Sequence, residues 1–224
     1  MDGLSEDGAR EVRAMVHVFD MQLGKVQIPV ETPDWDERYM NPARIEEGVQ
    51  AVHAWRDAKR KSVPEELPRF LVADKPRKTW PDAFTGWHGI YVVSGRAKNV
   101  IERFDPDLHQ FFEVPLRTKR GVEIEGPWFI MNVTVRQNSI VVEKSRVKVN
   151  DEFPDILCSF YSTSQTKDVV VDTSRLSPNI HFWREARFEG SLLGSDPFVT
   201  ALKEVGVKFF PSYPATNLGN LKEG

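Results

Sequence analysis

Apolar residues that recur at every second position predict strands over much of the chain. The strands are predicted at 68–74, 89–93, 109–116, 127–133, 139–143, 156–161 and 169–172, with a closing strand at 207–211. Apolar residues at helical spacing predict helices over 94–104 and 197–205. Because the strands come in groups and do not alternate regularly with helices, the pattern predicts an α+β fold. Its sheet should be mixed or mainly antiparallel, with a few helices packed on it.

The first half of the chain contains one alternating segment and one helical stripe. Residues 12–20 alternate, which predicts a strand. Asn41 and Pro42 suit the start of a helix, and an apolar stripe with charged residues on the opposite face follows them. The stripe comprises Ile45, Val49, Val52 and Trp55. Residues 27–36 and 75–88 are rich in proline and tryptophan, and we predict loops there.

The chain length of 224 residues fits one large domain or two small ones, and a chain of this size buries about 70% of its unfolded surface, which is ample for a core. We expect a single domain over residues 1–224, with an N-terminal subregion at 1–75 and a core at 89–211. The segments share no evident internal repeat. Apolar residues make up 40% of the chain and charged residues 28%, which is typical of globular proteins.

Composition and charge also indicate where the protein is located and which partners it can bind. No run reaches the roughly 18 apolar residues that span a membrane, and the polar N-terminus does not resemble a secretory signal. One cysteine, Cys158, cannot form an internal disulfide, which favours the cytoplasm. The formal charge of −3 argues against direct nucleic-acid binding, which needs a concentrated basic surface. The sequence leaves a homodimer open.

No segment carries a recognisable catalytic, metal or cofactor motif. The five histidines lie outside metal-ligand spacing of one another, and no GxSxG or phosphate-binding loop occurs. Ser94 stands between a predicted strand and a predicted helix, as in a nucleophile elbow, but Val92 replaces the upstream glycine. We therefore predict that Ser94 caps the helix. A chain with these features is more often a binding protein than an enzyme.

Aromatic residues are the remaining signal, and "HFWREARF" at 181–188 is the clearest example. Trp183 stands beside Arg184, and Arg187 follows. Tryptophan and arginine dominate interface hot spots, so these residues are candidates for a partner contact. The alternative is structural: Arg184 covers Trp183 by stacking, or it pairs with Asp172 inside the fold.

Five segments together resemble bacterial polymorphic-toxin immunity proteins, in particular immunity protein family eleven. They are "YVVSGRAKNVIERFDPDLHQFFEV", "PWFIMNV", "VVVDTSRL", "HFWREARF" and "GSDPFVTALKEVGVKFFP", and they span about residues 89–211. The resemblance maps a Trp-Arg pair onto Trp183 and Arg184 and an Asp-x-Ser segment onto Asp172 and Ser174. Trp128 and Ser94 lie in two of the other matching segments.

The resemblance implies a cytoplasmic antidote that binds a cognate toxin domain and blocks it without turnover or cofactor. Acidic segments could add charge complementarity to a basic toxin. The residues we expect to contact the partner are Trp183, Arg184, Arg187, Trp35, Asp34, Asp36, Glu37, Asp151 and Glu152. Two alternatives stay open, namely a detoxifying hydrolase and an adaptor that delivers a toxin for secretion.

Overall fold

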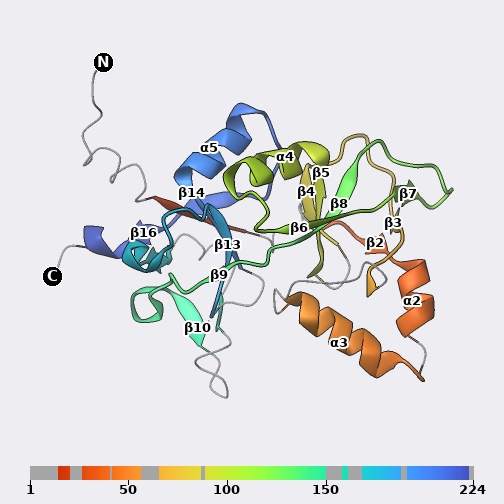
Figure 1. Cartoon of the computed structure of the whole chain (residues 1–224), viewed down its shortest axis with the longest axis horizontal. Coiled ribbons are helices and arrows are strands. Elements are labelled where there is room, and N and C mark those ends of the chain that lie inside the picture. Colours follow the sequence, from red (N-terminus) through yellow and green to blue (C-terminus); the bar gives the residue numbers. More distant parts are fainter. Residues whose placement is uncertain are drawn as a thin grey trace.

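The structure is a computed structural model that describes residues 15–20, 27–40, 42–56, 66–86, 89–149, 158–160, 168–187 and 191–221. For 52–56 and 158–160 it describes the backbone alone. Small mixed and antiparallel sheets combine with helices in this part of the chain (Figure 1). The predicted α+β class is confirmed.

Two sheets build the centre of the fold. The first is antiparallel, in the order β4 (Ala83–Thr85), β5 (Tyr91–Ser94), β8 (Trp128–Asn132) and β6 (Gln110–Glu113). The second has the order β15 (Ser212–Pro214), β1 (Val16–Phe19), β14 (Leu192–Ser195), β13 (Phe182–Glu185) and β9 (Arg136–Gln137). It is mixed, because β9 runs parallel to β13 while the other pairs are antiparallel.

One strand of each central sheet leads straight into a helix through a serine N-cap. Helix α4 (Gly95–Phe104) follows β5, and helix α5 (Asp196–Glu204) follows β14. The serine hydroxyl accepts a hydrogen bond from the amide three residues later, at 3.3 Å for Ser94 and 3.4 Å for Ser195. This bond satisfies one of the open amides of the first turn. The two predicted helices and the capping role of Ser94 are confirmed.

The two strand–serine–helix units bury the same positions counted from the serine. These are the third, sixth and seventh residues: Ala97, Val100 and Ile101 in α4, and Phe198, Ala201 and Leu202 in α5. The amino-acid sequence shows no evident repeat, because the two units share this spacing but almost no residue identities.

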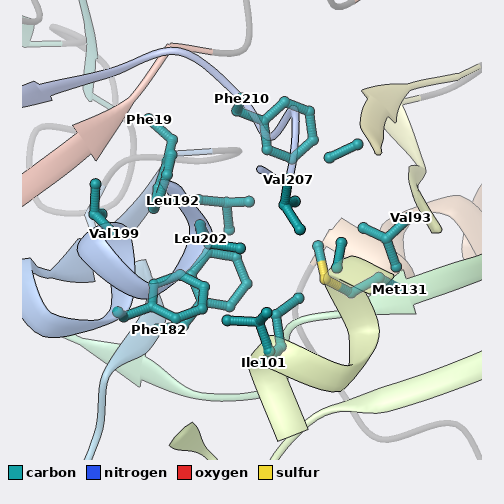
Figure 2. Close-up of a cluster of buried hydrophobic side chains, with 14 of the residues drawn as sticks. Phe19, Val93, Ile101, Met131, Phe182, Leu192, Val199, Leu202, Val207 and Phe210 are labelled. Carbon is teal, nitrogen blue, oxygen red and sulfur yellow. The ribbon is translucent and has the colours of Figure 1, made fainter. Parts of the chain in front are cut away.

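Helices α4 and α5 contact each other and cover the two central sheets (Figure 1). Helix α4 lies on β5 and β8, while α5 lies on β14 and β1. Figure 2 shows the core that forms between them, in which Phe182, Ile101 and Met131 approach from different elements. Burial of these aromatic and aliphatic side chains is the main force that joins the two units.

A third sheet combines β2 (Val30–Glu31), β3 (Leu71–Ala73) and β7 (Leu116–Thr118) at one end of the molecule (Figure 1). Helix α2 (Pro33–Tyr39) follows β2. The predicted loop at 27–36 is therefore wrong: Pro33 is at the start of a helix, where its missing N–H costs nothing. The loop predicted at 75–88 also contains a strand, β4.

Helix α3 (Ile45–Arg56) begins three residues after Pro42 and contacts α2. A Cβ at Gly48 would lie 2.9 Å from the Cβ of Tyr39, so Gly48 permits this close approach. The apolar stripe is largely exposed where the structure describes it, because Ile45 is 44% exposed and Val49 is 51% exposed.

Short elements complete the described chain. Two-stranded sheets pair β10 (Val147–Val149) with β11 (Cys158–Phe160) and β12 (Val170–Val171) with β16 (Thr216–Asn217). The 3-10 helices are Val142–Lys144, Thr173–Arg175 and Leu218–Asn220. The predicted strand at 139–143 reduces to one bridge at Ile140, and residues 207–211 precede β15 without forming a strand.

Candidate partner-binding residues and the buried polar groups

Trp183 and Arg184 lie inside the protein. They pair with Leu193 and Leu192 of β14, and their exposed fractions are 1% and 3%. The Arg184 Nε donates a 2.9 Å hydrogen bond to the carbonyl of Val133, and its guanidinium lies 5.0 Å from the centre of the Tyr91 ring. In this structure the pair holds β13 in place, which favours the structural alternative.

The alternative in which Arg184 pairs with Asp172 is wrong, because Asp172 belongs to a local turn. Its carboxylate forms an ion pair with Arg175 at 2.9 Å and accepts hydrogen bonds from the Ser174 amide at 3.1 Å and the Ser174 hydroxyl at 2.6 Å. The Ser174 hydroxyl and the neighbouring guanidinium lower the pKa of Asp172. The Asp-x-Ser segment therefore caps the short helix Thr173–Arg175.

Arg187 lies shortly after β13 and is half-buried. Asp151 and Glu152, the second acidic segment, lie outside the described residues. These three residues stay candidates for a partner contact.

The acidic segment at 34–37 is largely engaged within the fold. Asp34 accepts hydrogen bonds from Arg38 at 3.1 Å and from the Arg69 amide at 3.0 Å. Trp35 is buried, and its Nε1 donates to the carbonyl of Glu66 at 3.0 Å. Burial raises the pKa of Asp36, while its hydrogen bond from the Thr32 hydroxyl acts in the opposite direction.

Glu37 is the one exposed side chain of that segment. It therefore stays a candidate for a partner contact, whereas Asp34 and Trp35 mainly join α2 to the chain before β3.

The two remaining residues of the family segments also stabilise the fold. Trp128 is buried, donates to the Glu125 carbonyl at 2.8 Å, and packs edge-on against Trp80 and Phe84. The Ser94 hydroxyl donates to the carboxylate of Asp82 at 2.6 Å. The carboxylate of Asp82 thus holds the Ser94 hydroxyl in its position as the helix cap.

Sequence analysis missed a group of histidine contacts beside α5. The ring Nδ1 of His181 lies 2.8 Å from the Ser195 hydroxyl, and His17 Nε2 lies 2.8 Å from a carboxylate oxygen of Asp196. A serine–histidine pair is a catalytic arrangement when a third group orients the ring. Asp105, however, accepts from the backbone amide of His181 at 2.8 Å. We therefore interpret the group as the support of the α5 N-terminus.

Glu185, the next residue of β13, is a buried carboxylate with an exposed fraction of 1%. It accepts hydrogen bonds from the Ser139 amide at 3.0 and 3.1 Å and from the Ser139 hydroxyl at 2.6 Å. Loss of water raises the pKa of Glu185 above its ordinary value of 4.5, although the bonds from Ser139 act in the opposite direction.

This raised pKa predicts how stability depends on pH. Between pH 4.5 and the higher pKa of the folded state, the folded protein binds more protons at Glu185 than the unfolded chain does. The free energy of unfolding should therefore decrease as pH rises through this range. Glu185→Gln removes the titration, so the free energy of unfolding of this variant, relative to that of the wild type, should rise with pH. Urea unfolding at pH 4.5, 5.5, 6.5 and 7.5 measures the difference, and a pH-independent difference would contradict the assignment.

The described residues contain no group of three or more His, Cys, Asp or Glu side chains that could hold a metal ion. The helices among them are too short or too polar to cross a membrane.

The structure defines an α+β protein in which Trp183, Arg184, Trp35 and Asp34 make contacts that hold the fold. A model of the immunity protein family (Imm11) matches residues 14–215. The chain belongs to this family. The resemblance first seen at 89–211 is thus confirmed, and the match also includes most of the N-terminal half. No curated protein matches the chain.

Proposed function

We propose that the protein neutralises a cognate bacterial toxin effector by binding its toxic domain in the cytoplasm, one copy to one copy. The observation that carries this proposal is the immunity-family match over residues 14–215. Such proteins protect the producing cell during bacterial competition. The neutralisation would need no turnover, because occupation of the toxin is sufficient.

The binding energetics required for this role are ordinary for a chain of this size. A standard interface buries about 800 Å² on each partner. Nanomolar protection corresponds to about −12 kcal/mol, and a few well-packed anchors can contribute most of it. Exposed charged and apolar side chains would form the interface, while the buried Trp183 and Arg184 stabilise the fold that carries them.

The test is co-expression with the toxin that we expect to be encoded beside this gene. We expect cells that express the toxin alone to stop growing and cells that express both proteins to grow normally. Calorimetric titration of the purified toxin domain should show an endpoint of one immunity protein per toxin. Continued killing would contradict inhibition.

The same experiment separates the two alternatives. Protection by far less than one equivalent would favour a detoxifying enzyme. Tight binding that leaves the toxin fully active would favour an adaptor for secretion.

A further inference from the structure

The third sheet places two exposed segments at the same end. Strands β3 and β7 are parallel, with Ala73 opposite Thr118. The segments that follow them, residues 75–79 and 119–123, therefore leave the sheet side by side, and every residue in both is exposed. Figure 1 shows the green hairpin after β7 extending outward at this end of the molecule. We call these two segments the basic hairpin surface.

This surface and its immediate neighbours are basic although the whole chain has a formal charge of −3. Six cationic side chains occur here against three carboxylates, a net charge of +3. The cations are Lys75, Arg77, Lys78, Arg117, Lys119 and Arg120, and the carboxylates are Glu31, Asp74 and Glu123. The opposite signs of the local and the total charge show that the cations are concentrated and not simply abundant.

The three carboxylates are already engaged. Lys119 contacts Asp74 at 2.7 Å and Glu31 at 3.0 Å, while Arg117 contacts Glu123 at 3.3 Å. Four cations thus remain without an ion pair in the part of the chain that the structure describes: Lys75, Arg77, Lys78 and Arg120. Arg77 also lies over the Trp80 ring, 5.9 Å from its centre. A partner can thus bind these four charges without breaking an ion pair of the fold.

An apolar residue stands among these cations. Val122 is 63% exposed, more than any other large apolar side chain that the structure describes. Its position is fixed by a tight turn: the Thr118 amide donates to the Val122 carbonyl at 2.8 Å, and the Val122 amide donates to the Thr118 hydroxyl at 3.2 Å. Gly121 adopts a φ of +79°, which favours glycine. A preformed turn lowers the entropy cost of binding.

We propose that the basic hairpin surface is where the toxin docks, and that it fits a toxin face with several carboxylates around an apolar recess for Val122. The inference rests on the proposed function and names the surface that performs it. Lysine and arginine form strong hydrogen bonds with carboxylates when water is excluded. The concentrated charge also steers an acidic partner and accelerates association.

Nucleic acid is the other macromolecule that a basic surface can attract. The exposed Val122 at the hairpin tip favours a protein partner, because an aliphatic side chain gains little from a phosphate backbone. The total charge of the chain also opposes a polyanion at long range.

The decisive experiment measures binding of the full chain to the purified toxin domain encoded beside its gene. The test variant combines Lys75→Glu, Arg77→Glu, Lys78→Glu and Arg120→Glu. The control variant combines Lys144→Glu, Lys148→Glu, Lys203→Glu and Lys208→Glu, four exposed lysines outside this surface. Both variants change the total charge equally, so a difference between them reports position and not net charge.

We expect the test variant to weaken binding by about 100-fold or more. At high salt most of this loss should disappear, unless Val122 is substituted as well. The control variant should stay within about threefold of the wild type. Val122→Asp alone should weaken binding by about tenfold or more. Thermal unfolding of all variants should match the wild type, because the substituted side chains are exposed.

The outcomes separate the two proposals. If the wild type neutralises the toxin and the test variant binds as tightly, the docking surface is wrong while the proposed function stands. If the wild type fails to bind or neutralise the toxin, both fall. Equal loss in the test and control variants would also overturn the docking surface. Tighter binding to a fluorescent DNA duplex than to the toxin would replace it with a nucleic-acid surface.

Discussion

Trp183→Ala is expected to lower the free energy of unfolding by about 3–5 kcal/mol, the cost of removing a large aromatic side chain from a packed core. Trp183 is 1% exposed. The buried residues of its cluster are Val16, Val18, Ile140, Val147, Val169, Val171 and Leu193. They come from distant parts of the chain, so the cavity cannot close by a local adjustment. Urea unfolding at neutral pH measures the loss, which is a large part of the total stability of a typical domain.

Trp183→Phe is the matched control. The indole Nε1 of Trp183 is buried and has no hydrogen-bond acceptor among the described residues, so phenylalanine removes an unsatisfied donor while it keeps most of the packing. We expect a loss of less than about 1.5 kcal/mol for this variant. A loss below 1 kcal/mol for Trp183→Ala would show that the side chain is not part of the core.

The elements that sequence patterns predicted well are those with local signals. The helix at Gly95–Phe104 has a serine cap, apolar residues at helical spacing and an Asp-Pro pair beyond its end. Sequence patterns did not predict helix α2. Its seven residues, Pro33–Tyr39, are too few for a periodic signal, and the two prolines of 27–36 resemble those of a loop. Strand β4 has three residues and is defined by its pairing with β5, which no local pattern records.

The candidate site was harder to predict because composition does not distinguish a core from an interface. Trp183 and Arg184 have the chemistry of interface anchors, yet pairing with β14 places both in the interior. Asp34 looked like a free acid, but the amide that it binds belongs to Arg69, 35 residues away. Only the tertiary structure reveals such partners.

The basic hairpin surface escaped sequence analysis for the same reason. Its two segments, 75–79 and 119–123, are about forty residues apart, and neither is basic enough alone to indicate a binding site. The parallel register of β3 and β7 brings them together. Three acids, Glu31, Asp74 and Glu123, also reduce the apparent charge of the sequence, although Lys119 and Arg117 bind them in the structure.

Asp82→Ala is the second large effect that we expect, a loss of about 2–4 kcal/mol in the free energy of unfolding. The buried carboxylate of Asp82 accepts from the Ser94 hydroxyl at 2.6 Å and from the Lys208 amide at 2.8 Å. Its backbone bonds the same two residues, at 2.8 and 2.9 Å. Asp82 thus joins the start of α4 to the segment after α5. Alanine would leave two donors without their acceptor in a mostly buried site, which is costly. Thermal and urea unfolding would measure the loss.

Two further variants distinguish this link from an ordinary cap. Asp82→Asn keeps one acceptor oxygen, so it should lose about half as much stability as Asp82→Ala. Asp172→Ala removes a carboxylate whose hydrogen bonds and ion pair are all local, with Ser174 and Arg175. A local cap of this kind is worth about 1 kcal/mol. If Asp82→Ala costs no more than Asp172→Ala, then the connection through Asp82 does not hold the two strand–serine–helix units together, and apolar packing between α4 and α5 must do so alone.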